Sequence, residues 1–261
     1  MKHTKLLPAA LAMFFASTFH AQYLEVEIDS VHTGIHTASC GDVDLTGYVT
    51  FSVWAVVPDS LSCLVAILGG NTDAVDDLGC GNPLDYDNLQ ITFDGNVYND
   101  PIGGITSASQ FCPLFVTYPA SQWDSDITIG GECAGDGAEV FIIGLPCDDT
   151  DFGVFAAANC TDNFNTLDVF IDYGGWFTLA GGFNLNSIAG TDHRVKIPQF
   201  TTNDGFCMNG WMSWQVLCEP GNVIESVWFD ICQPMPCDDF GSDIIANIFP
   251  EEGGETFSIE I

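Results

Sequence analysis

The chain has 261 residues, of which 36 are acidic and only 4 are lysine or arginine, so its formal net charge is −32 at pH 7. A protein this acidic repels nucleic acid and anionic membrane surfaces, and the composition therefore excludes both as partners. The chain also carries 11 cysteines, far more than a reduced cytosolic enzyme holds without a metal motif.

The first 21 residues have the layout of a secretory signal peptide. Two lysines precede an apolar run from Leu6 to Phe19, which is too short to span a bilayer. We expect cleavage after Ala21, and a secreted or cell-surface protein that does not insert into the membrane once the signal is removed. The wide, irregular cysteine spacings then predict disulfide bonds rather than a metal ribbon.

Most of the remaining chain has the period of β-strands. Leu24, Val26 and Ile28 alternate with acidic residues, which indicates a strand with one apolar and one solvated face. Residues 48–57 and 63–68 are apolar on both faces and indicate central strands that are covered on both sides. Further strands, each bounded by Gly, Pro, Asn or Asp, are predicted at residues 89–93, 127–130, 140–144, 167–173, 176–179, 194–200, 210–218 and 223–231.

This pattern predicts an all-β protein. We expect an antiparallel β-sandwich or jelly-roll-like fold, stapled by disulfides and with little helix. No Pro/Ser-rich linker divides the chain, so the prediction is one sandwich domain over residues 22–232 and a C-terminal tail over 233–261. Because the cysteine count is odd, one thiol stays free or forms an intermolecular disulfide, and Cys232 or Cys237 is the expected one.

Five segments carry a resemblance to a known kind of module. They are residues 48–55, 64–69, 98–104, 123–130 and 194–202. Together they resemble an uncharacterised β-rich module of secreted Bacteroidetes proteins, commonly cargo of the type IX secretion system. The module usually has an aromatic residue directly before Val-Thr-Ile-Gly, whereas here Asp126 takes that place.

The end of the chain resembles the opening of a type IX sorting domain. Phe257, Ile259 and Ile261 alternate as such a domain does, but Glu251 and Glu252 replace its Asn-Pro turn. The tail is therefore either a truncated sorting domain or an edge strand of the sandwich.

The sequence offers no catalytic motif. It has no Gly-x-Ser-x-Gly elbow, no His-Glu-x-x-His pair and no phosphate-binding glycine loop, so we assign no catalytic residue and expect no enzyme. His32 and His36 are predicted to be solvated loop residues. Asp124 and Asp126 are the pair that a polysaccharide hydrolase would use, because glycoside hydrolysis needs one protonated and one ionised carboxyl group.

Three residues are the candidates for ligand binding. Arg194 and Lys196 lie on one face of their predicted strand, where they either recognise a carboxylated or sulfated glycan or neutralise adjacent acidic loops. Trp123, together with Trp176 and Trp211, either forms a sugar-stacking platform or belongs to the core or rim of the sandwich.

Two aspartate-rich loops are the candidates for metal binding. Calcium takes several carboxylate and carbonyl oxygens from one flexible loop, and solvated turns are the alternative. The predicted calcium ligands are Asp73, Asp76, Asp77, Asp148, Asp149 and Asp151.

The sequence thus predicts a secreted, non-catalytic β-sandwich module that binds an extracellular glycan, a surface protein or calcium. A secreted polysaccharide hydrolase and a structural or adhesive coat protein are the alternatives. A cleft with two facing carboxylates would favour the hydrolase, and a flat aromatic face would favour the binding module. Association through a strand edge or an unpaired cysteine would favour the coat protein.

Overall fold

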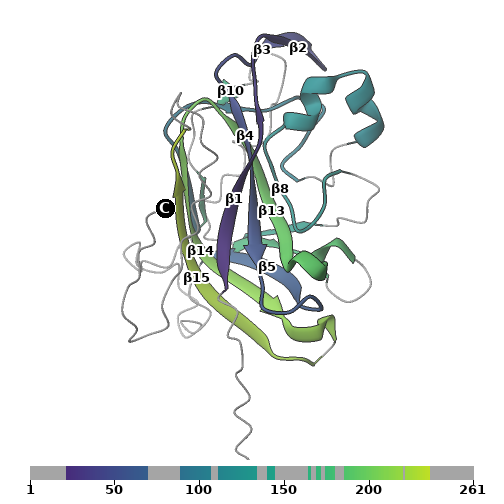
Figure 1. Cartoon of the computed structure of the whole chain (residues 1–261), viewed down its shortest axis with the longest axis vertical. Coiled ribbons are helices and arrows are strands. Elements are labelled where there is room, and N and C mark those ends of the chain that lie inside the picture. Colours follow the sequence, from purple (N-terminus) through teal and green to yellow (C-terminus); the bar gives the residue numbers. More distant parts are fainter. Residues whose placement is uncertain are drawn as a thin grey trace, which may run out of the picture.

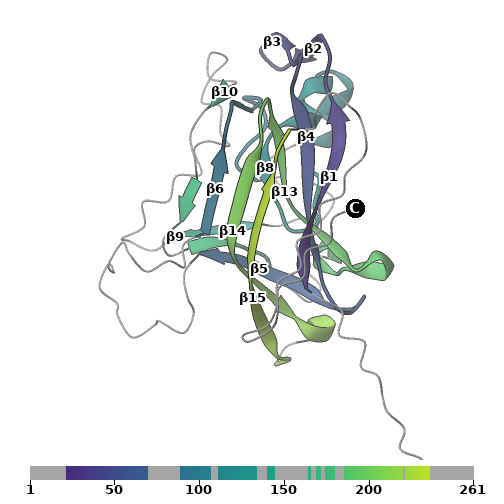
Figure 2. The ribbon, with the colours of Figure 1, turned by 60° about the vertical axis from the view of Figure 1, so that its left-hand side comes forward.

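The protein folds into two β-sheets that pack face to face, as the computed structural model in Figures 1 and 2 shows. The structure describes residues 22–69, 89–106, 111–133, 140–144, 164–165, 169–171, 174–179, 185–219 and 221–235. The predicted signal peptide and the tail from residue 236 onward lie outside these ranges. Within them the strands pair antiparallel, which confirms the predicted all-β sandwich.

The first sheet has the order β1-β4-β13-β7-β10, and β8 also pairs with β13. Its strands are β1 (Tyr23–Val31), β4 (Val49–Val56), β7 (Val97–Tyr98), β8 (Asp126–Ile127), β10 (Phe164–Asn165) and β13 (Arg194–Thr202). The strand β4 lies between β1 and β13 and is buried on both faces, as its apolar sequence predicts.

The second sheet has the order β11-β6-β14-β5-β12-β9, and β15 pairs with β14. Its strands are β5 (Cys63–Gly69), β6 (Leu89–Phe93), β9 (Phe141–Gly144), β11 (Val169–Ile171), β12 (Gly174–Phe177), β14 (Phe206–Gln215) and β15 (Ile224–Gln233). The strand β14 is central, because β15 pairs along one side of it while β6 and β5 share the other side.

Aromatic side chains from both sheets fill the space between them. The ring of Phe206 lies 5.0 Å from Phe200 and 5.5 Å from Phe51, centroid to centroid. Trp176 is fully buried and donates its indole N–H to the carbonyl oxygen of Thr128, at 2.9 Å. Each such buried ring stabilises the fold by roughly 1.5–3 kcal/mol through the apolar surface it removes from water.

A smaller cap covers one end of the sandwich (Figure 1). It consists of the hairpin β2 (Ile35–Ala38) and β3 (Gly41–Asp44) and two short 3-10 helices, η3 (Cys112–Val116) and η4 (Pro119–Trp123). The hairpin lies against η4 and shares with it a second apolar cluster. Further 3-10 turns are η6 (Leu185–Ser187), η7 (Gly190–Asp192) and η8 (Val216–Cys218), and no described helix is long and apolar enough to cross a membrane.

All seven cysteines in the described ranges are disulfide-bonded. Three bonds have both partners described, with Cα–Cα distances of 5.1 Å for Cys63–Cys218, 5.6 Å for Cys112–Cys133 and 4.0 Å for Cys207–Cys232. The expectation that Cys232 is free is therefore wrong, because the register of β14 and β15 places it directly opposite Cys207. Its alternative, Cys237, lies outside the described residues.

Candidate functional site

Arg194 and Lys196, the two basic residues beyond the predicted signal peptide, lie together on the first sheet, but acidic neighbours already surround them. Val195 and Ile197 face the core, so Arg194 and Lys196 share the opposite face, as predicted. The guanidinium of Arg194 lies 3.4 Å from Glu25, 3.5 Å from Glu27 and 3.8 Å from Asp192.

Other contacts also occupy the side chains of Arg194 and Lys196. Arg194 stacks over the ring of Trp54, 4.6 Å from its centroid, and the ammonium group of Lys196 donates to the side-chain oxygen of Gln199 at 2.9 Å. Lys196 also interacts electrostatically with Asp29 and Asp126. This arrangement favours the neutralising role, with the acids coming largely from neighbouring strands rather than from loops.

Trp123 packs against two imidazole rings that also contact each other. Its ring is 4.3 Å from that of His32, which follows β1, and 4.7 Å from that of His36, which lies on β2. We call His32, His36 and Trp123 the histidine–tryptophan cluster. His32 is only 3% exposed, so the expectation of a solvated loop histidine is wrong for it, because the β2–β3 hairpin folds back against η4.

A buried chain of hydrogen bonds connects this cluster to the sheet. The Nε2 atom of His32 lies 2.7 Å from the hydroxyl of Thr50, which in turn lies 2.7 Å from the hydroxyl of Thr201. Removal from water, and to a smaller extent the neighbouring His36, lowers the pKa of His32 to about 4. The cluster therefore holds His32 as a neutral ring.

The segments at 98–104 and 123–130, which carry part of the family resemblance, meet at two buried carboxylates. Asp100 accepts hydrogen bonds from the hydroxyls of Ser39, Ser121 and Tyr98. Asp124 accepts the backbone N–H of Asp100 at 2.6 Å. These bonds tie the β2–β3 hairpin, the loop after β7 and η4 into one cap.

The close approach of the loop after β7 to Asp124 requires glycine at position 103. A Cβ atom at this position would collide with the carboxylate of Asp124, so only glycine lets the loop approach so closely. Asp124 is therefore enclosed by backbone, with 1% of its surface exposed.

The pair Asp124 and Asp126 does not lie in an open cleft. Both side chains are buried, and desolvation raises the pKa of both carboxyl groups well above the ordinary value, while Lys196 opposes the rise at Asp126. Asp124 contacts the loop after β7, whereas Asp126 lies on β8 beside Lys196. A saccharide cannot reach either carboxylate in this arrangement.

The predicted calcium ligands at 73–77 and 148–151 lie outside the described residues. Among the residues that the structure does describe, no three His, Cys, Asp or Glu side chains are grouped so that they could hold a metal ion.

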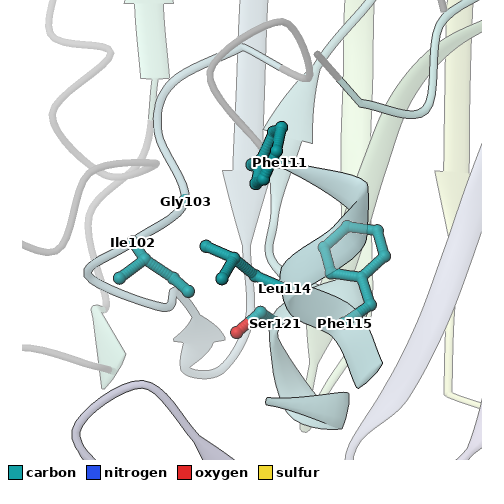
Figure 3. A pocket seen from close by; sticks show the side chains of 6 residues that line it. All are labelled: Ile102, Gly103, Phe111, Leu114, Phe115 and Ser121. Atoms are coloured by element: carbon teal, nitrogen blue, oxygen red, sulfur yellow. The ribbon is translucent and has the colours of Figure 1, made fainter. Parts of the chain in front are cut away.

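A shallow apolar hollow lies in the cap (Figure 3). Two of its lining residues contact the buried carboxylates, Gly103 that of Asp124 and Ser121 that of Asp100. Leu114 of η3 extends toward Ile102, and the hydroxyl of Ser121 lies near the base. The free space of the hollow is about 170 Å³, which includes the open solvent at its mouth. The enclosed part is too narrow to hold a water molecule. Its dimensions do not suit a sugar or a cofactor.

The outer face of the second sheet carries a pair of indole rings. Phe206, Met208, Met212 and Trp214 of β14 are buried in the core, so the residues between them face outward. Trp211 is one of these, and the register places Trp228 of β15 directly opposite it. The two rings are 5.6 Å apart in an edge-to-face arrangement, and both are partly exposed.

Polar groups adjoin this indole pair. On one side the hydroxyls of Ser213 and Ser226 lie 2.8 Å apart. On the other side Asn209 stands opposite Asp230, which is exposed. Hydrogen-bonding groups therefore lie in the rows that flank the rings on both sides.

The three tryptophans named from the sequence thus have different environments. Trp123 lies in the cap, Trp176 is core with 0% exposure, and Trp211 faces outward. Sequence reasoning missed Trp228, although it is out of phase with the core residues Phe229 and Ile231. Only the strand register shows that it stands beside Trp211.

No protein-family model, no curated protein and no solved structure matches the chain. The resemblance to secreted Bacteroidetes modules therefore stays a prediction.

Proposed function

We propose that the protein is a secreted, non-catalytic module that binds a glycan through the outer face of its second sheet. The observation that carries this proposal is the Trp211–Trp228 pair, because two partly exposed indoles meet edge to face on adjacent strands. Aromatic rings offer large apolar contact area at little entropic cost, and sugar rings present an apolar face to them.

The polar neighbours support the same ligand class. The hydroxyl of the exposed Ser226 and the side chains of Asn209 and Asp230 can exchange hydrogen bonds with sugar hydroxyls at the edges of a stacked ring, while the buried Ser213 holds the Ser226 hydroxyl in place. A purely apolar protein ligand would leave such groups without partners.

The cysteine chemistry supports an extracellular location. All seven described cysteines are paired, and such bonds form in oxidising compartments. Together with the signal-like first 21 residues, this supports secretion, and the resemblance stated above makes the type IX system of Bacteroidetes the proposed route.

A glycan array, followed by calorimetric measurement of the affinity for the glycans that bind, tests the proposal. We expect the wild-type protein to bind at least one glycan without releasing a product, and Trp228→Ala to weaken that binding about tenfold, since a stacked ring contributes on the order of 1.4 kcal/mol. Phe111→Ala is the matched control, because Phe111 is an aromatic residue with 54% exposure in the cap, far from the indole pair along the chain. This control should bind as the wild type does.

Three results would overturn the proposal. Binding that Trp228→Ala leaves unchanged would exclude this face. Turnover of an arrayed glycan would favour the hydrolase instead, and self-association of the chain with no glycan binding would favour the coat protein.

A further inference from the structure

A second aromatic pair lies on the same outer face. Trp176 points into the core, so Phe177 points outward, and its register partner on β9 is Phe141. The two rings are 5.5 Å apart with an interplanar angle of 28°, which is a stacked arrangement. Phe141 is 40% exposed.

The register places both aromatic pairs on one continuous row of strands. Trp211 stands opposite Leu68 of β5, and Leu68 stands opposite Gly175 of β12. Phe177 lies two residues beyond Gly175, hence on the same face. Neighbouring strands are spaced ~4.8 Å apart, so the five strands from β15 to β9 span roughly 19 Å.

The described side chains between the two pairs are apolar. The strand β5 presents Ala66 and Leu68 outward, of which Ala66 is buried and Leu68 is partly exposed, and Gly175 contributes no side chain. These residues therefore add an apolar surface that connects the two aromatic pairs. Such a surface suits a long ligand that crosses the strands better than a single compact one.

Charge restricts what that ligand can be. Arg194 and Lys196, the only lysine or arginine beyond the predicted signal peptide, both lie on the first sheet. Asp230 exposes a carboxylate beside the indole pair. A carboxylated or sulfated glycan would meet repulsion here and no compensating cation.

Resting on the proposed function, we infer that this face binds an extended, uncharged polysaccharide chain that crosses the strands from Trp228 to Phe141. The Trp211–Trp228 pair forms one stacking position and the Phe141–Phe177 pair forms the other. Stacking at two positions requires a ligand long enough to reach both.

Calorimetric titration with an uncharged oligosaccharide series, from disaccharide to hexasaccharide, tests this inference. The series is taken from the polysaccharide that the intact protein binds best. We expect the affinity of the wild type to rise with length, and Phe141→Ala to weaken hexasaccharide binding roughly three- to tenfold while leaving disaccharide binding unchanged. Phe141→Leu keeps much of the side-chain volume without the ring, and it should show the same loss if Phe141→Ala does not fold.

The outcomes separate this inference from the proposed function. Affinity that does not depend on length, or full hexasaccharide affinity in both Phe141 variants, overturns the two-position platform while the Trp228 result still supports glycan binding. Preference for a sulfated or carboxylated analogue of the same length overturns the uncharged class. Failure of every glycan to bind overturns both proposals together.

Discussion

His32 is a buried group whose protonation opposes folding. In the unfolded chain a histidine protonates near pH 6.5, whereas in the folded protein the pKa of His32 is about 4. The folded state therefore prefers the neutral ring, so this contribution to the free energy of unfolding is complete above pH 6.5 and is lost as the pH falls toward 4. We expect a loss of roughly 1 kcal/mol for each pH unit, measured by urea unfolding between pH 7 and pH 4.5.

Two variants isolate this effect from the rest of the acid titration. The raised pKa values of Asp124 and Asp126 act in the opposite direction, because protonation of those buried carboxyls stabilises the folded state as the pH falls. His32→Gln retains a donor and an acceptor near Thr50 but does not titrate, so its acid loss should be smaller than that of the wild type. His36→Gln removes the second cause of the low pKa and should give an intermediate loss. Equal acid losses in all three proteins would contradict the prediction.

At the level of elements, the disulfides differ in how much chain they constrain. Cys63–Cys218 joins residues 155 positions apart, whereas Cys207–Cys232 joins residues 25 positions apart on adjacent strands. Because a crosslink stabilises by restricting the unfolded chain, replacing the first pair by serines should cost about 5 kcal/mol and replacing the second about 3.5 kcal/mol. Chemical denaturation of the two double variants measures both costs, and a larger loss from the shorter loop would contradict the prediction.

The longer strands could be predicted from the sequence because their alternation is strong. The apolar runs at 48–57 and 63–68 correspond to β4 and β5, and the run at 223–231 corresponds to β15. The hairpin β2–β3 and the two-residue strands β7 and β10 were missed, since such short strands are defined by their partners rather than by a periodic pattern.

The site was less predictable for the same reason. Trp211 could be named as a candidate from its residue type, but its neighbour Trp228 follows only from the antiparallel register. Likewise, Asp124 and Asp126 looked like a catalytic pair by spacing, while the structure turns one toward the Asp100 loop and the other toward Lys196. Strand pairing and burial, which depend on distant parts of the chain, decide both cases.

For the whole molecule, the excess of carboxylates should make stability depend on salt. With 36 acidic residues against 4 basic ones, the folded state holds like charges closer together than the unfolded state does. Salt shortens the screening length from ~10 Å at 0.1 M to ~3 Å at 1 M. We expect the melting temperature to rise on the order of 5 °C over that range, as a thermal melt in NaCl would measure.

A second thermal melt, in calcium chloride at the same ionic strength, is compared with the melt in NaCl. A rise beyond that produced by NaCl, reversed by a chelator, would support calcium binding by the loops at 73–77 and 148–151. Equal rises in the two salts would contradict the calcium prediction, and a melting temperature that does not change with NaCl would contradict the repulsion argument.

The pairing of early strands with late ones sets the order of events during synthesis. β1 and β4 can pair early, but β4 also needs β13, and β5 and β6 need β14, so these three strands, made before residue 94, find a main partner only after residue 193. A ribosome must therefore pass residue 194 before the first layer can close and residue 206 before the second can. Until that moment the core between the two sheets lacks Phe200 and Phe206, so a chain that was exported while being synthesised would be threaded before its core had formed.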